Sequence, residues 1–142
     1  MAKNIIITGT SSGIGYELVK IFSAKGHNII ALSRNILPTN DLRLSNVYSI
    51  SFDINNNSDH KVLIEYISKN WEHVDILINN AGVLINKPFS ETTTEDFKKV
   101  YSTNVFGVAA IINSILPFAK KGSHVVNISS VGGVQGSTKF AG

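Results

Sequence analysis

A glycine-rich stretch near the N-terminus is the first place in this sequence where chemistry could be done. Residues 6–18, IITGTSSGIGYEL, run from an apolar, β-branched segment into a helical pattern and carry glycines at 9, 13 and 15. Glycine is favoured where another group must approach the backbone closely. Two chemistries would require this: a phosphate bound by the free amides of a helix N-terminus, or a serine nucleophile exposed at a sharp turn.

The nucleophile is the weaker of the two hypotheses. Gly9-Thr10-Ser11-Ser12-Gly13 is a literal G-x-S-x-G between a strand and a helix, so Ser11 would be the nucleophile of a serine hydrolase. Such an enzyme also needs an acid and then a histidine. The histidines are His27, His60, His73 and His124, and none lies in an evident loop with a carboxylate partner. They also lack metal-ligand spacing, so no metal site is expected.

The phosphate hypothesis explains more of the stretch. Amides at a helix N-terminus are unpaired and the helix dipole adds positive charge, so an anion is favoured there. Gly13 and Gly15 would remove side chains, and Thr10, Ser11 and Ser12 would add small hydroxyl groups. The spacing G-x-x-x-G-x-G is neither a Walker loop nor G-x-G-x-x-G. A purely structural turn of glycine and serine remains the alternative.

Five short β-rich runs must position this turn, and they are near-continuous in apolar residues, as in strands buried on both faces of a parallel sheet. They are Asn4–Thr8, Asn28–Leu32, Val47–Phe52, Val74–Ile78 and His124–Ile128. Helical patterns alternate with most of them, which indicates β-α-β units in a doubly wound α/β fold. In such sheets a ligand binds beyond the carboxyl ends of the strands, where the Gly9–Gly15 turn lies.

The helices carry their own start and stop signals. We expect one apolar face on the first helix, a left-handed C-cap at its end, a second helix capped by a serine, and a capping box before a longer third helix. The residues concerned are Ile14, Leu18, Ile21 and Phe22 for the face, Gly26 for the C-cap, Ser58 for the serine cap, and Thr92 with Glu95 for the box.

Length and composition favour a single globular domain over residues 1–142, with 43% hydrophobic and 16% charged residues. The net charge of +3 is small and its basic residues are scattered, so no nucleic-acid partner is expected. No run approaches 18 consecutive apolar residues, so no membrane partner is expected. The absence of cysteine and the short apolar start favour a cytoplasmic protein.

Five motifs in order resemble the short-chain dehydrogenase/reductase family along the whole chain. They are Thr8-Gly9-x-x-x-Gly13-Ile14-Gly15, Asp53-Ile54, Asn79-Asn80-Ala81-Gly82, the stretch YSTNVFGV and the stretch VVNISSVGG. The resemblance implies a three-layer Rossmann-type sheet with strand order 3-2-1-4-5, lacking the C-terminal strands and helices. It also implies an oxidoreductase that transfers hydride between a nicotinamide cofactor and a small carbonyl or alcohol substrate.

The resemblance assigns the cofactor to residues from four loops. Gly9, Ser11, Ser12, Gly13, Ile14 and Gly15 would hold the diphosphate and the adjoining ribose. Asp53 would accept a hydrogen bond from the adenine amine, beside the backbone of Ile54. Asn80, Ala81 and Gly82 would line the floor of the pocket. A capping or turn role is the alternative for Asp53, and a tight turn for the other three.

Ser33 and Arg34 bear on the choice of cofactor. Family members that prefer NAD place a carboxylate at the end of the second strand, where this chain has Ser33 followed by Arg34. A carboxylate would repel a 2′-phosphate, whereas an arginine offers a positive fork of donors. We therefore expect NADP(H), with NAD(H) as the alternative. A second basic residue, which many NADP-binding members have just before Gly13, is replaced by Ser12.

The resemblance assigns catalysis to Asn104, in a water-linked proton relay, and to Ser130, which would donate a hydrogen bond to the substrate carbonyl. The family's Tyr-x-x-x-Lys pair follows the serine, but no tyrosine follows Ser130 here. We therefore expect an N-terminal, cofactor-binding portion of a longer reductase, inactive by itself. A nucleotide-binding module without catalysis is the alternative.

The resemblance also implies a homodimer or homotetramer. In the family, the helix that carries the active-site asparagine packs in a bundle between subunits. Here that helix is expected at about residues 94–116, and its apolar residues nearly encircle it. They are Val105, Phe106, Val108, Ile111, Ile112 and Ile115. A helix buried only within its own subunit would show the same pattern.

Overall fold

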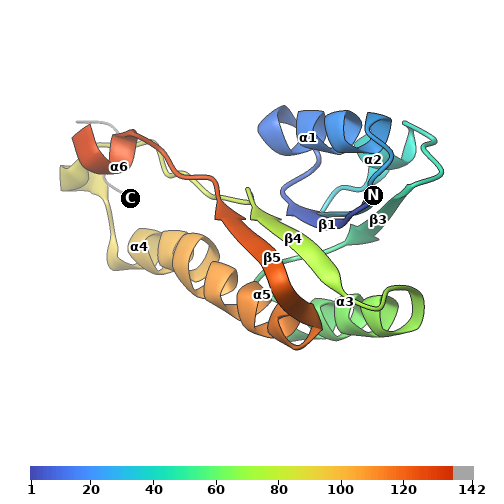
Figure 1. Cartoon of the computed structure of the whole chain (residues 1–142). Helices are drawn as coiled ribbons and strands as arrows, with labels where there is room; N and C mark the ends of the chain where they lie inside the picture. The colour runs from blue at the N-terminus through green and yellow to red at the C-terminus, as the bar shows by residue number, and fades with distance from the viewer. Residues whose placement is uncertain (136–142) are drawn as a thin grey trace.

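The structure is a computed structural model that describes residues 1–135. Five strands form one parallel sheet in the order β3-β2-β1-β4-β5 (Figure 1). This confirms the predicted doubly wound α/β fold and its strand order. The strands are β1 (Asn4–Thr8), β2 (Asn28–Ser33), β3 (Val47–Ser51), β4 (Val74–Asn79) and β5 (Ala119–Asn127).

Helices cover both faces of the sheet, with α1 and α2 on one side and α3 and α5 on the other, while α4 continues the line of α5 beyond the ends of β4 and β5 (Figure 1). The helices are α1 (Gly13–Ala24), α2 (Leu37–Asn40), α3 (Asn57–Asn70), α4 (Thr94–Tyr101), α5 (Val108–Ile115) and α6 (Gly132–Gln135). Short 3-10 turns lie at Phe89–Glu91 and Leu116–Phe118. A π-helical turn, Ser102–Gly107, joins α4 to α5.

The core lies in two layers because successive residues of a strand point to opposite faces. Ile5 and Ile7 of β1 pack with Val19 of α1. Ile6 faces the other layer, where it packs with residues of α3 and α5, including Leu63 and Ile111. All three isoleucines of β1 are fully buried. A central strand enclosed in this way fixes where its carboxyl end, and hence the glycine turn, must lie.

The end of α1 agrees with the expected stop signal, and half of its expected apolar face packs against the core. Gly26 has φ +78° and its amide donates to the Ser23 carbonyl at 2.9 Å, which confirms the left-handed C-cap. Leu18 and Phe22 of the expected face pack against the core beside the fully buried Val19, whereas Ile14 and Ile21 are exposed. The helix is rotated because Gly15 and Val19 must lie against the sheet.

Two predicted helix caps are displaced by one or two residues. The cap of α3 is Asn56, whose side chain accepts from the Ser58 amide at 2.9 Å, so Ser58 is not the cap. The capping box of α4 joins Thr93 and Asp96 instead of Thr92 and Glu95. In the second case Lys87 pairs with Asp96 and thereby favours this register.

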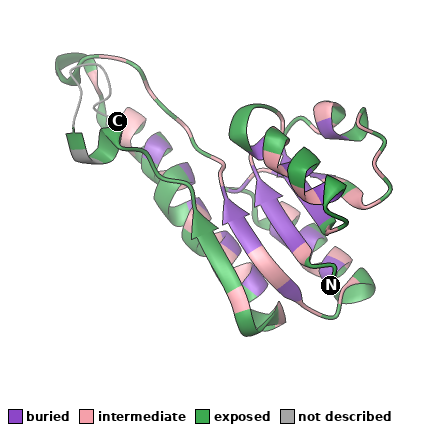
Figure 2. Ribbon diagram, turned by 45° about the horizontal axis from the view of Figure 1, so that its top comes forward, coloured by how far each residue is buried: buried purple, intermediate pink, exposed green. Residues whose placement is uncertain are grey.

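Strand β5 begins at Ala119, earlier than the predicted His124, and forms the exposed edge of the described sheet (Figure 2). Its side chains are almost all exposed, including Val125 and Val126. The early residues pair with the start of β4, after which the register shifts between Val74 and Ile76. The apolar pattern of residues 124–128 therefore marked only the second half of the strand.

The helical run Thr94–Phe118 spans α4, the π turn and α5. By length and composition it is the one helix in the described part of the chain that could cross a membrane. Ile111 and Ile115 pack into the core, whereas Val105 and Phe106 are exposed. The expectation of no membrane segment, which rested on uninterrupted apolar residues, did not anticipate this helix.

Candidate functional site

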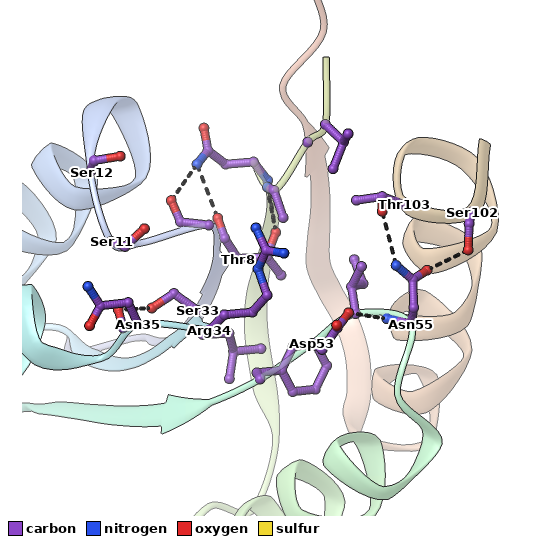
Figure 3. A pocket seen from close by; sticks show the side chains of 18 of the residues that line it. Thr8, Ser11, Ser12, Ser33, Arg34, Asn35, Asp53, Asn55, Ser102 and Thr103 are labelled. Atoms are coloured by element: carbon purple, nitrogen blue, oxygen red, sulfur yellow. Dashed lines mark hydrogen bonds between the residues drawn. The ribbon is translucent and has the colours of Figure 1, made fainter. Parts of the chain in front are cut away.

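A cleft of about 670 Å³ opens at the carboxyl ends of β1, β2, β3 and β4 (Figure 3). That is a volume typical of a small-molecule or cofactor site. The structure brings most of the predicted cofactor residues to this one cleft. Those that line it are Gly9, Ser11, Ser12, Ile14, Ser33, Arg34, Asp53, Ile54, Asn80, Ala81 and Gly82.

At the turn between β1 and α1, the start of the helix lacks both a capping side chain and an acidic residue. Ser12 is the N-cap residue, but its side chain makes no capping hydrogen bond, and the first turn of α1 holds no acidic residue. The amides of Gly9 and Thr10 turn away to the Leu32 carbonyl, at 2.8 and 3.3 Å. The N-terminal amides of α1 are thus suited to an anion.

The three glycines of the turn serve different purposes. A Cβ on Gly15 would lie 2.3 Å from the Gly9 carbonyl oxygen, so this position is required by packing. A Cβ on Gly9 would lie 2.8 Å from the Cα of Ala81, and Gly9 has φ +72°. Gly13 has φ +59° and would meet no atom within 4 Å. Neither Gly13 nor Gly15 lines the cleft directly, so their predicted contact with a diphosphate remains a prediction.

Thr8 and Asn80 fasten the glycine turn to the end of β4. The buried Thr8 hydroxyl oxygen accepts from the amides of Asn80 and Ala81, at 3.0 and 2.9 Å. The Asn80 amide group donates to the carbonyls of Thr8 and Gly9, at 3.1 and 3.0 Å. These bonds hold the two strand ends together at the point where the strand order reverses, which is where open α/β sheets bind ligands.

The end of β2 places one hydroxyl and one guanidinium side by side with different roles. The Ser33 side chain is buried and donates to the Asn35 carbonyl at 2.7 Å, so it stabilises the turn. Arg34 is exposed and extends into the cleft (Figure 3). Of the two residues, Arg34 is therefore the one whose charge is available to a ligand.

Asp53, Ile54 and Asn55 form the opposite wall. The Asp53 amide donates to a carboxylate oxygen of Asp59 at 2.7 Å, and one carboxylate oxygen of Asp53 accepts from the Asn55 amide at 2.9 Å. The Asn55 side chain donates to the Thr103 hydroxyl at 3.0 Å (Figure 3). This wall is therefore tied both to α3 and to the π turn.

The two predicted catalytic residues do not line the cleft. The Asn104 side chain pairs in both directions with the backbone of Val83, accepting from its amide and donating to its carbonyl, each at 2.8 Å. The Ser130 hydroxyl oxygen accepts from the Gly132 amide at 3.1 Å, and Ser130 is exposed. Within the described residues, the Asn104 side chain holds the loop at Val83, and the Ser130 side chain holds the turn at Gly132.

Sequence reasoning missed several lining residues, which include Phe52, Asn55, Lys99, Ser102 and Thr103. Phe52 ends a predicted strand and directly precedes Asp53, so the sequence does indicate its place beside the cleft. Lys99, Ser102 and Thr103 come from the helical run nearly fifty residues later. Only the observed packing of that run across the end of β3 brings them to the cleft.

The hydrogen bonds do not support the hypothesis that Ser11 is the nucleophile of a serine hydrolase. All four histidines fall within residues 1–135, and none is bonded to Ser11. His60 is buried and bonded at both ring nitrogens, to Ser114 and Ile54. Among the described residues there is also no group of three or more metal-ligating side chains.

Comparison with known proteins places the chain in a family. Residues 3–142 match the family described as short chain dehydrogenase. A 3-ketodihydrosphingosine reductase of Bacteroides thetaiotaomicron is 34% identical over 134 residues, covering 93% of this chain and 48% of that protein. A probable short-chain type dehydrogenase/reductase, VdlC, of Helicobacter pylori is 32% identical, covering 90% of this chain and 48% of its own length.

Solved structures agree in fold as well as in sequence. A short-chain dehydrogenase from Streptomyces avermitilis superposes with a TM-score of 0.85 at 33% identity, covering 94% of this chain and 51% of that one. A short chain dehydrogenase/reductase from Saccharomyces cerevisiae gives 0.84 at 31% identity, covering 92% and 54%. The chain thus spans about half the length of the curated relatives it matches. With its sheet order, its glycine turn and these matches, it belongs to the short chain dehydrogenase family.

Proposed function

We propose that this chain is the cofactor-binding portion of an NADP(H)-dependent oxidoreductase that interconverts a carbonyl and an alcohol. The observation that carries the proposal is the convergence of three groups on one cleft. They are the uncapped start of α1, the exposed Arg34 and the carboxylate of Asp53. Together they match an anionic diphosphate, a 2′-phosphate and an adenine amine.

Each group has a role that its chemistry suits. The amides after Ser12 would bind the diphosphate with help from the helix dipole. Arg34 would pair with the 2′-phosphate as a planar fork of donors. Asp53 keeps one carboxylate oxygen on the Asn55 amide, so its other oxygen would accept from the adenine amine.

The reaction itself needs residues beyond this cleft. The nicotinamide ring would supply or accept the hydride. Ser130 would donate a hydrogen bond to the substrate oxygen, and Asn104 would hold the loop at Val83 near the proton relay. The proton donor would be a tyrosine of a Tyr-x-x-x-Lys pair in the longer protein. Sequence following residue 142 that lacks such a pair would favour a nucleotide-binding module without catalysis.

The cofactor preference is tested by reversing the charge at Arg34. We expect the full-length protein to bind NADPH more tightly than NADH, and Arg34→Asp to weaken NADPH binding by about tenfold, because a charge-assisted pair becomes a repulsion. Titration calorimetry with both nucleotides measures the two affinities. The control is Arg43→Asp, which makes the same change of charge at an exposed residue outside the cleft.

The outcomes separate the parts of the proposal. An unchanged ratio of NADPH to NADH affinity in Arg34→Asp would remove Arg34 as the 2′-phosphate ligand. Equal losses in Arg34→Asp and Arg43→Asp would show a general effect of charge. Absence of binding heat with either nucleotide in the unaltered, folded protein would overturn the cofactor site as a whole.

We further propose that the protein assembles with copies of itself through the helical run Thr94–Phe118. Supporting this, Val105 and Phe106 are exposed on the side of the run that faces away from the core. A second copy would cover them, as contiguous apolar surface of this kind marks interaction sites. The substrate would be a small molecule bound where the cleft meets the loop after β4.

A further inference from the structure

His60 is a buried, fully hydrogen-bonded histidine that the proposed chemistry does not use. It lies in the first turn of α3 with 7% of its surface exposed. Its Nε2 is 2.9 Å from the Ile54 carbonyl oxygen, and its Nδ1 is 2.9 Å from the Ser114 hydroxyl oxygen on α5. Its ring packs against Phe52, with 4.9 Å between the ring centres. One side chain therefore joins α3, α5 and the wall of the cleft.

The partners of His60 select one tautomer of the ring. A carbonyl oxygen can only accept, so the Nε2 that faces Ile54 must carry the proton. In the neutral ring Nδ1 is then an acceptor, and the Ser114 hydroxyl can donate to it. The Ser114 hydroxyl is also placed to donate to the Ala110 carbonyl at 3.0 Å, one turn back in the same helix, and its single proton serves one of these two bonds at a time. The Ile54 carbonyl is thus the partner that requires a proton on Nε2, whichever bond the Ser114 proton serves.

The bond from His60 acts on Asp53 through a single peptide plane. The Ile54 carbonyl and the Asn55 amide belong to the same planar, trans peptide group, so they point in opposite directions. His60 binds the carbonyl on one side, and on the other side the Asn55 amide donates to a carboxylate oxygen of Asp53 at 2.9 Å. Fixing the carbonyl therefore fixes the direction of the hydrogen bond that orients the Asp53 carboxylate.

Other contacts already hold the Ile54 side chain and the Asp53 amide, so the orientation of the Ile54–Asn55 peptide depends on His60. The Ile54 side chain is buried, and a Cβ on Gly107 would come within 2.8 Å of its Cγ2, so it is tightly packed. The Asp53 amide is already bound by Asp59. Without a donor on the Ile54 carbonyl, its peptide could rotate toward solvent and release the Asp53 carboxylate.

We propose that His60 is a positioning residue for the adenine side of the cofactor site, and that it orients the Asp53 carboxylate through the Ile54–Asn55 peptide. The proposal rests on the proposed function, because it assumes that Asp53 meets the adenine. A loss of this bond would leave only a fraction of the molecules with the wall in its binding conformation, and the apparent affinity would fall by that fraction.

The test compares three variants of the full-length protein. His60→Gln keeps an N–H donor at about the place of Nε2, whereas His60→Met keeps the bulk and removes the donor. Ile67→Val is the matched control, since Ile67 is fully buried on the same face of α3 but does not line the cleft. Affinities for NADPH and for 2′-phospho-ADP-ribose, and stability in urea, are measured for each variant.

We expect His60→Met to weaken both ligands by about fivefold, the effect of one hydrogen bond. His60→Gln should stay within about twofold of the unaltered protein, and Ile67→Val should lose stability with unchanged affinity. Unchanged affinity in His60→Met would overturn the proposal, and so would equal losses in His60→Met and His60→Gln. A loss for NADPH that spares 2′-phospho-ADP-ribose would do the same, because the adenine side would then not be affected.

A spectroscopic measurement tests the proposal even if the variants fail to fold. In the unaltered protein at pH 8, nitrogen-15 spectra of the His60 ring should show the tautomer protonated at Nε2. Protonation at Nδ1 would overturn the proposal, because the ring could not then donate to Ile54. If the unaltered protein binds neither nucleotide, the proposed function fails first, and the ring spectrum still reports on the bond itself.

Discussion

At the start of α1, the α-carbon of Gly15 faces the carbonyl oxygen of Gly9, and the amide nitrogen of the Asn80 side chain lies beside it. A methyl group on Gly15 would come within 2.3 Å of the first atom and 2.5 Å of the second. The first of these is a backbone atom held by the turn and by β1, so it cannot move aside. The chemistry of the turn thus depends on a packing constraint one residue beyond Ile14.

We predict that Gly15→Ala lowers the free energy of unfolding by about 3 kcal/mol, because the helix must move away from the turn. Gly13→Ala should cost about 1 kcal/mol, the price of placing an alanine at a positive φ with open space around it. Urea unfolding of both variants measures the difference. Equal costs would contradict the different roles that the structure gives the two glycines.

The sequence predicted which residues meet at the turn better than it predicted why they are there. The sequence alone does not distinguish a glycine that lets an anion approach from a glycine that lets another part of the backbone approach. The structure places Gly15 against Gly9 and Asn80, a packing role that the spacing does not indicate, and its contact with a diphosphate stays a prediction. The distinction needs the pairing of β1 with β4, which joins residues about seventy positions apart.

The elements that carry the site are held by polar bonds at their ends. The start of α4 has a complete capping box, in which the Thr93 hydroxyl accepts from the Asp96 amide at 3.2 Å and the Asp96 carboxylate accepts from the Thr93 amide at 2.8 Å. Lys87 pairs with the same carboxylate from the preceding loop. These bonds fix the helix that delivers Ser102 and Thr103 to the cleft.

We predict that this helix start weakens in acid. The hydrogen bond from Lys87, followed by those from Thr93, lowers the pKa of Asp96 from its ordinary 3.8 to about 2. The unfolded chain therefore binds the proton first, so the stabilisation is complete above pH 4 and is lost as the pH falls toward 2. The protection of the Thr93 amide against hydrogen exchange, followed between pH 5 and pH 2, measures the loss of this stabilisation.

The variant Asp96→Asn separates this effect from general acid unfolding. It keeps an oxygen that can accept from Thr93 but has no charge for Lys87. We expect it to exchange faster at pH 5 and to show a weaker dependence on pH. A profile identical to that of the unaltered protein would mean that Asp96 does not control the start of α4.

At this scale the strands were predicted well because five apolar runs alternate with helices, and their order was confirmed. The caps were predicted less well. Three threonines in a row, Thr92 to Thr94, could each cap the helix, and both Thr92 and Thr93 have an acidic residue three positions later. The choice of Thr93 depends on Lys87, whose contact with Asp96 is a matter of tertiary structure.

The molecule as a whole presents its apolar surface unevenly. The sheet is enclosed around β1, whereas β5 and the outer side of the helical run Thr94–Phe118 are exposed (Figure 2). Relatives that match this chain are about twice as long. Their similarity shows the family, and the solved structures show the fold.

We predict that Phe106→Glu disrupts self-association in the full-length protein. Phe106 is 66% exposed in the single chain, and a buried, unpaired carboxylate would oppose its burial by a second copy. Light scattering after size-exclusion chromatography should show a smaller particle. The control is Val62→Glu, at a valine of α3 that is 53% exposed. A mass unchanged by Phe106→Glu would remove this helix from the assembly.

The position of β1 between β2 and β4 has a consequence for biosynthesis. Of the five described strands β1 is translated before the others, and β2 can join it soon afterwards along one edge. Its other edge must wait until Val74–Asn79 has been translated. During that interval three isoleucines and a row of backbone groups stay open to any neighbouring strand. The nascent polypeptide is therefore most prone to mispairing at β1, in the interval before β4 has been translated.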